Sequence, residues 1–231
     1  MSMCGRAYET YTEEELEMRY QSKKPIKIPK VRPNYNMCPT HFSPIVLERD
    51  GTRTIELFRW GLVPSWARDV KSADKYSLIN ARSEDIELKR TYQRPFHEQR
   101  CIVPLTGFYE WKRPEKGPKK PFAIHLRDNS IMSVAGVWEK WLSKETGEEI
   151  DSFSIITTSA NKFMSKVHNR MPVIFNKEAE EIWLDRNLKD SNVLKEMLVP
   201  CPDDWLEARE VSTLVNSPKN NSPEVLKPTM P

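Results

Sequence analysis

The stretch that predicts the fold class reads Phe122-Ala123-Ile124-His125-Leu126-Arg127. Large apolar residues alternate here with small or polar ones, and a period of two is typical of a β-strand with one buried face. Asp128-Asn129-Ser130 follows and predicts a turn. The apolar segment at 131–138 then predicts a returning strand, so this part of the chain is expected to form an antiparallel hairpin.

The sequence on both sides repeats this pattern of short strands and turns. Asp50-Gly51 separates two apolar stretches and is a typical hairpin signal. Thr12 and Glu15 fit a capping box, which predicts a helix that begins at Thr12. Strands joined by hairpins, with helices interspersed, predict a single α+β domain built mainly on antiparallel sheets. The remaining expected strands are 44–48, 54–60, 101–103, 107–111, 153–158 and 209–213, and the remaining helices 160–167, 177–187 and 191–198.

The composition argues against several classes of protein. The 231 residues contain no run of about 18 apolar residues, which a membrane-spanning helix needs. The first six residues lack the apolar core of a signal peptide, so we expect a cytoplasmic protein. The four cysteines include no CxxC pair and the four histidines form no metal-binding pattern. We therefore expect no disulfide framework, no metal and no cofactor. The net charge of +3 is too small to establish a nucleic-acid partner.

Cys4 is the first candidate for chemistry. One interpretation is a partly buried thiol near the chain end. The other is that Met3 is the natural initiator and that its removal leaves Cys4 as the first residue. A terminal cysteine carries an α-amine and a thiol on adjacent carbons, with reference pKa values near about 8 and 8.5. The amine condenses with an aldehyde to an imine, and the thiol then closes a thiazolidine ring.

Glu110 and His168 are candidates for proton transfer. Glu110 lies among aromatic residues in Gly107-Phe108-Tyr109-Glu110-Trp111, where strand alternation places Trp111 on the opposite face. A desolvated carboxylate has a raised pKa and suits general acid–base catalysis, whereas an exposed edge-strand glutamate does not. His168 is expected at the end of a helix, because Pro172 prevents continuation, and a helix C-terminus favours its protonated form. Helix capping is the alternative role.

Two further segments carry candidate binding residues. Asn80 and Arg82 share one face of an extended segment and can orient a substrate and a phosphate. The alternative is a turn asparagine and a surface salt bridge from Arg82 to Glu84. A loop that carries Pro64 and Trp66 can stack against nucleobases, although core packing is the commoner fate of tryptophan. The other tryptophan near this loop, at position 60, is expected in the core, and Trp66 is expected to be exposed.

The order of these motifs along the chain is more specific than any one of them. The chain resembles the SOS response-associated peptidase family, the SRAP domain, from Cys4 to about Pro223. The motifs that carry the resemblance are Met3-Cys4-Gly5-Arg6, Trp60-Gly61-Leu62-Val63-Pro64, Asn80-Ala81-Arg82-Ser83-Glu84, Arg100-Cys101-Ile102-Val103-Pro104, Gly107-Phe108-Tyr109-Glu110-Trp111, Ala135-Gly136-Val137-Trp138-Glu139 and His168-Asn169-Arg170-Met171-Pro172.

The resemblance implies a barrel-like β core with flanking helices and a sensor of abasic sites in single-stranded DNA. In such a protein the terminal cysteine traps the ring-opened deoxyribose as a thiazolidine crosslink that protects the lesion. The family is also named for a proposed autoproteolysis that exposes the cysteine. By motif match, the nucleophile would be Cys4, the positioning residue Asn80, the acid–base Glu110 and the ring-opening residue His168. The DNA-binding residues would be Arg6, Pro64, Trp66, Arg82 and Arg170.

The expected boundaries follow from the same match. Residues 4–223 form the domain, 1–3 are either artificial or a processed extension, and 224–231 form a loose tail. We expect a monomer that associates with the nucleoid when bound to DNA, or a nuclear protein in a eukaryotic source. Two other functions use the same residues: an N-terminal-nucleophile cysteine peptidase or amidohydrolase, and a non-covalent binder of single-stranded DNA.

Overall fold

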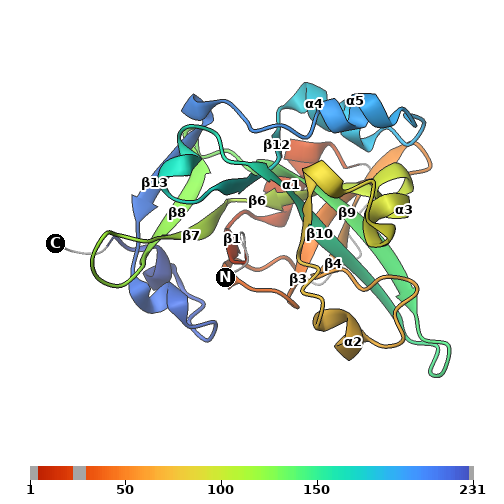
Figure 1. The fold of residues 1–231 in the computed structure, drawn as a ribbon, viewed down its shortest axis with the longest axis horizontal. Helices are drawn as coiled ribbons and strands as arrows, with labels where there is room; N and C mark the ends of the chain where they lie inside the picture. The colour runs from red at the N-terminus through yellow and green to blue at the C-terminus, as the bar shows by residue number, and fades with distance from the viewer. Residues whose placement is uncertain (1–4, 23–29, 229–231) are drawn as a thin grey trace.

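A closed barrel of five strands forms the centre of the computed structural model, which describes residues 5–22 and 30–228 (Figure 1). Neighbouring strands pair around the ring, and β9 pairs back with β10 to close it. Among the pairings within this ring of described strands, only that between β10 and β4 is parallel. In ring order the strands are β10 (Glu149–Ser159), β4 (Thr52–Trp60), β3 (Phe42–Arg49), β6 (Arg100–Leu105) and β9 (Met132–Leu142).

A second, five-stranded antiparallel sheet packs against the barrel. Residues 122–126 of the alternating stretch lie in its strand β8, which pairs with β7 on one side and β13 on the other. The expected alternation holds, because Phe122, Ile124 and Leu126 pack in one apolar cluster and Ala123 packs in another. The hairpin expected between this stretch and 131–138 was wrong, because the second segment lies in the barrel strand β9, which pairs with β6 and β10 instead. The α+β class with a barrel-like core is confirmed. In spatial order the strands are β13 (Leu206–Glu210), β8 (Lys120–Leu126), β7 (Gly107–Lys112), β1 (Ala7–Glu9) and β2 (Asn34–Met37).

Three short strands attach to the barrel and bring distant motifs together. Strand β5 (Asn80–Arg82) runs parallel to β10, and β11 (Arg170–Pro172) pairs antiparallel with the same strand. Strand β12 (Ile174–Phe175) pairs with β9. The Asn80 and Arg170 motifs, about ninety positions apart in the chain, thus share β10 as a common partner.

Two apolar clusters form most of the core. An inter-sheet core includes Trp60 and Phe153 of the barrel and Phe108 of the second sheet. A helix-side core joins barrel residues to the buried faces of the helices, including Phe96 and Trp183. None of the helices in the described ranges is both long and apolar enough to span a membrane. They are α1 (Glu13–Tyr20), α2 (Val70–Asp74), α3 (Arg90–Glu98), α4 (Lys177–Leu184) and α5 (Ser191–Glu196).

The expected capping box at the start of α1 is present. Glu15 N–H donates to Thr12 Oγ1 at 3.2 Å, and the Thr12 N–H donates to the Glu15 carboxylate at 2.7 Å. The sequence did not indicate α3, which contains Pro95 and so lacks one backbone donor. Burial of Tyr92 and Phe96 against the barrel compensates for that loss.

Three further local expectations were wrong. The helix expected at 160–167 is a single 3-10 turn, η2 (Met164–Lys166), and the Asn161 side chain accepts from the Met164 N–H at the start of this turn, as a capping residue does. The late strand lies at 206–210 rather than 209–213, because those residues pair with β8. Residues 224–228 belong to the packed body, since Val225 is buried in the turn η5 (Pro223–Leu226). Residues 229–231 lie outside the described ranges.

Candidate functional site

Strand β7 carries Glu110 into the edge of the inter-sheet region. Gly107 begins the strand, and a side chain there would meet the Ile124 backbone oxygen at 2.4 Å, so only glycine permits the close approach of β7 to β8. Alternation then places Phe108 in the inter-sheet core and Tyr109 in a separate cluster beneath the C-terminal turns. Glu110 is 6% exposed, and it lines a cavity.

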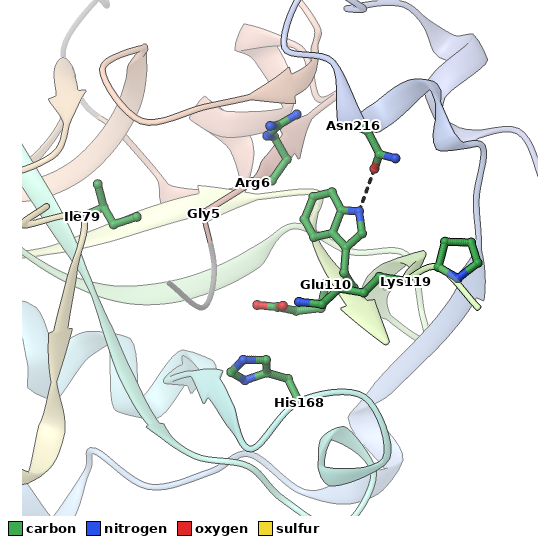
Figure 2. Close-up of a pocket in the computed structure, with 9 residues that line it drawn as sticks. Gly5, Arg6, Ile79, Glu110, Lys119, His168 and Asn216 are labelled. Atoms are coloured by element: carbon green, nitrogen blue, oxygen red, sulfur yellow. Dashed lines mark hydrogen bonds between the residues drawn. The ribbon is translucent and has the colours of Figure 1, made fainter. Parts of the chain in front are cut away.

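The cavity has a volume of about 560 Å³. Glu110 enters it from β7 and His168 from the loop before β11, and both side chains extend into the same part of the cavity (Figure 2). The cavity thus brings together two candidates that are 58 positions apart. Its lining residues are Gly5, Arg6, Ile79, Glu110, Trp111, Pro118, Lys119, His168 and Asn216.

The backbone around His168 fixes the state of its ring. The Arg170 N–H donates to His168 Nδ1 at 3.1 Å. Because an N–H can only donate, Nδ1 is the acceptor, and the proton of the neutral ring lies on Nε2. Burial lowers the pKa of His168, and the positive charges of Lys119 and Arg170 lower it further. The expectation that a helix end favours the protonated ring was therefore wrong, since only a 3-10 turn precedes His168.

The opposite wall of the cavity is built by Arg6, Trp111 and Asn216. Trp111 Nε1 donates to Asn216 Oδ1 at 2.7 Å, the bond drawn dashed in Figure 2. The Arg6 guanidinium lies 5.9 Å from the centre of the Trp111 ring, within cation–π range. Arg6 Nη1 also donates to Asn36 Oδ1 at 2.7 Å and to the Val215 carbonyl at 2.6 Å. Arg6 therefore braces this wall while it lines the cavity.

Two of these wall residues could not be recognised from the sequence. Trp111 lies on the far face of β7, as alternation predicts, but the cavity extends around the strand and reaches it. Asn216 comes from the polar C-terminal segment, which carries no motif. Both contributions depend on the packing of the turn η4 (Thr213–Asn216) against the second sheet.

The start of the described chain leads into this cavity. Gly5 lines it, and the next residue along the chain is Cys4 (Figure 2). Cys4 itself, with residues 1–3, lies outside the described residues. The expectation for Cys4 therefore stays a prediction.

Asn80 follows the cavity-lining Ile79 at the start of β5. Its backbone pairs with Ile155 of the barrel, and its carbonyl oxygen accepts from the Tyr92 hydroxyl at 3.1 Å. Asn80 is half-buried. The structure thus holds the Asn80 backbone rigidly beside the cavity wall.

The two arginines expected to bind phosphates differ in their surroundings. Arg82 is exposed. Arg170 has a 16% exposed side chain, and Glu84 binds it through both oxygens, at 2.5 and 2.9 Å. Arg170 Nη2 also donates to the Thr157 carbonyl at 2.7 Å. The alternative of a salt bridge from Arg82 to Glu84 was therefore wrong, because pairing through β10 brings Arg170 to Glu84 instead.

The expectations for the tryptophans are confirmed. Trp60 is buried, and its Nε1 donates to the Ile79 carbonyl at 3.0 Å. Trp66 is 50% exposed. Pro64 is buried in the same loop and does not present its ring to solvent.

Within the described ranges, no three histidine, cysteine or acidic side chains gather as metal ligands would. The three cysteines in the same part of the chain, Cys38, Cys101 and Cys201, are buried free thiols. Burial raises the pKa of each of them, which makes them poor nucleophiles.

Comparison with known proteins shows close relatives along nearly the whole chain. It is 37% identical over 226 residues to the abasic site processing protein YoqW of Bacillus subtilis, covering 97% of this chain and 99% of that protein. It is 31% identical over 239 residues to the abasic site processing protein HMCES of Gallus gallus, covering 91% and 70%. A crystal structure of a protein from Bacteroides thetaiotaomicron matches with a TM-score of 0.89 at 29% identity, covering 98% of this chain and 100% of that one.

A family model gives the same result. The model described as SOS response associated peptidase (SRAP) matches residues 3–218, which include every motif quoted above. The chain therefore belongs to the SRAP family.

Proposed function

We propose that this protein processes abasic sites in single-stranded DNA by forming a covalent crosslink through Cys4. One observation carries the proposal: Glu110 and His168 extend into one cavity that is also lined by Gly5, the residue bonded to Cys4. The names of the relatives, abasic site processing proteins, supply the class of substrate.

The reaction proceeds in two steps once the deoxyribose ring has opened to its aldehyde. The α-amine of Cys4 adds to the carbonyl carbon, and loss of water gives an imine. The thiol sulfur then adds to the imine carbon while its proton passes to the nitrogen, which closes a thiazolidine. No oxidant or reductant is needed, because the carbon keeps its oxidation level throughout.

Glu110 is placed to move protons in these steps. Protonated, it delivers a proton to the departing hydroxyl of the carbinolamine; ionised, it accepts one from the attacking amine. Its low exposure keeps bulk water from competing for these transfers. Asn80, on the rigid strand next to Ile79, is assigned to hold the Cys4 terminus and the sugar.

His168 acts as a hydrogen-bond donor rather than as a base. Its Nδ1 accepts from the Arg170 N–H, so the proton that faces the cavity is the one on Nε2. This N–H stabilises negative charge on the sugar ring oxygen as the ring opens. The lowered pKa keeps the ring neutral near pH 7, which preserves this tautomer.

Phosphate binding falls mainly on Arg82, whose side chain is exposed beside the Asn80 segment. Arg170 already has Glu84 as a bidentate partner, so we assign it to orienting His168 and the β11 backbone. Arg6 contributes positive charge to the cavity wall while it holds Asn36 and Val215.

The test uses protein whose intact mass verifies that Cys4 is the first residue. This protein is mixed with single-stranded DNA that carries one abasic site, and the products are separated on a denaturing gel. We expect a shifted band, and no band from Cys4→Ala or from a form that retains Ser2 and Met3, whose Cys4 nitrogen is an amide. Equal crosslinking by the retained-residue form would refute the terminal-amine mechanism.

The name of the family, which includes the word peptidase, favours one alternative. In that function Cys4 attacks an amide, and the same cavity binds a peptide. Hydrolysis of a peptide by the verified protein, without DNA and without a crosslink to abasic DNA, would favour it over the proposal.

A further inference from the structure

An exposed aromatic pair lies outside the cavity. Trp66 is 50% exposed and Tyr76 is 63% exposed, and their ring centres lie 6.3 Å apart at an interplanar angle of 67°. Such an edge-to-face contact leaves one broad ring face of the pair open to solvent. Two neighbouring aromatic side chains with this much exposure are unusual on a protein surface that binds no other molecule. The backbone of the loop that carries Trp66 is, in contrast, held firmly.

The backbone of the Trp loop (63–67) is braced by buried side chains of the barrel. The Val63 N–H donates to Ser152 Oγ at 2.8 Å, and Trp141 Nε1 donates to the Ala67 carbonyl at 2.7 Å. Both Ser152 and Trp141 are almost fully buried. Trp66 therefore projects from a fixed backbone.

Glu139 braces the same loop from β9. Its buried carboxylate accepts from the Ser65 backbone N–H and is paired with Arg94 of α3. A loop with this many buried anchors loses little conformational freedom when its exposed side chain binds a ligand. The bracing thus favours a binding role for Trp66 over a role in packing.

Tyr76 is held at a fixed place relative to the cavity. Ser77 adopts a positive φ of 50°, and the next residue, Leu78, accepts from the Leu62 N–H at 2.9 Å. Ile79, three residues after Tyr76, lines the cavity. Three residues span at most about 11 Å, which is the length of about three nucleotides of a stacked strand, so the Tyr76 backbone lies within that distance of a residue that lines the cavity.

The charge around the pair suits a nucleic-acid strand. Arg68 has a 91% exposed side chain and lies 3.7 Å from the Asp69 carboxylate, whereas Lys71 and Lys75 are exposed and form no salt bridge with described residues. The other acidic residue of this segment, Asp74, is paired with Arg59 at 2.7 Å. The surface next to the rings therefore carries a net positive charge.

We propose that Tyr76 and Trp66 together form a stacking surface for a nucleobase of the single strand, a few nucleotides from the abasic site. This rests on the proposed function and adds Tyr76 as a residue that reads the position of an intact base. Stacking of a base on an aromatic ring tolerates every sequence, because every base has a π face. The surface would therefore set the register of the strand without selecting its sequence.

The experiment measures binding separately from the covalent step. The probe is a single strand that carries one tetrahydrofuran abasic analogue, which lacks the hydroxyl needed for ring opening. In a series of such strands, the base at each of the three nucleotides on either side is removed in turn. We compare the wild-type protein with Tyr76→Leu, which keeps an apolar side chain, and with Tyr76→Phe, which keeps the ring.

With the full strand, we expect Tyr76→Leu to weaken binding roughly tenfold, as loss of one base–aromatic contact does, and Tyr76→Phe to stay within about twofold. In one strand of the series, the base that was removed is the one that stacks on Tyr76. The wild type and Tyr76→Leu should bind this strand with equal affinity, because neither can make the stacking contact. Met18→Ala, an 82% exposed apolar residue of α1, should bind as the wild type does throughout.

A constant ratio between wild type and Tyr76→Leu at every position, or no effect of Tyr76→Leu on the full strand, would overturn the stacking role. The reactive abasic strand is run in parallel on a denaturing gel. Failure of the wild type to crosslink would refute the proposed function alone, because the binding series still decides whether Tyr76 stacks on a base.

Discussion

Two buried carboxylates on neighbouring strands of the same sheet have opposite surroundings. Glu110 on β7 is 6% exposed and Glu9 on the adjacent β1 is 4% exposed. Glu110 opens into the cavity beside His168. Glu9 is enclosed between the sheets, where its carboxylate accepts from the Ser43 hydroxyl and also contacts Tyr11. Burial alone therefore does not distinguish the candidate for proton transfer from the enclosed carboxylate, whereas access to the cavity that His168 also lines does.

The two positions also differ in what their protonation does. Burial raises the pKa of Glu9 to about 8, and the bonds from Ser43 and Tyr11 offset only part of that rise. At neutral pH Glu9 is therefore mostly a neutral acid that links β1 to the barrel. Glu110 is assigned to exchange protons with a substrate, whereas Glu9 is assigned to keep its proton.

The largest expected effect concerns stability at Glu9. The folded pKa of about 8 exceeds the reference value of 4.5, so the folded state holds its proton more tightly than the unfolded state does. The stabilisation of the folded state by this proton is fully present below pH 4.5 and is lost as the pH rises to about 8. The free energy of unfolding should fall by several kcal/mol, on the order of 4, across that window.

Chemical denaturation at pH 5 and at pH 8.5 measures this change. Glu9→Gln keeps the shape and remains neutral, so its stability should vary less with pH and exceed that of the wild type at pH 8.5. A wild type whose stability is the same at both pH values would show that Glu9 does not retain its proton on folding.

The next effect concerns catalysis at Glu110. Glu110→Gln should slow crosslinking by about a hundredfold or more, because it removes the proton carrier and keeps the shape. Glu9→Gln should crosslink at the wild-type rate near pH 7. Single-turnover gels with abasic single-stranded DNA measure both rates, and equal rates for the two variants would remove the distinction drawn between these carboxylates.

The smallest effect concerns the two arginines that border the cavity region. Arg82→Ala should lower the slope of log affinity against log salt by about 0.7, the change expected for one lost phosphate contact on a single strand. Arg170→Ala should leave this slope nearly unchanged and slow crosslinking instead, because it disturbs the segment that holds His168. Titrations of the unreactive abasic strand at several salt concentrations measure the slopes. Equal slope changes in both variants would mean that a phosphate displaces Glu84 from Arg170.

Short-range patterns predicted much of the fold. The capping box of α1, the hairpin at Asp50-Gly51 and the alternation in β8 each depend on residues within a few positions of one another. Such signals fail where contacts between distant residues decide. Strand β9 pairs with barrel strands rather than with β8 despite the turn at 128–130, and packing against the barrel stabilises α3 in spite of Pro95.

The sequence by itself determined the α+β class and the types of residue at the candidate site, because those follow from periodicity and side-chain chemistry. Only the tertiary structure decided which of these residues meet. Because β5 and β11 both pair with β10, Glu84 forms its salt bridge with Arg170 rather than with Arg82. Packing of the two sheets leaves Glu110 at the cavity that His168 also lines, and it encloses Glu9 beside Ser43. No local pattern could predict this difference, because it depends on pairing between strands that are distant in the sequence.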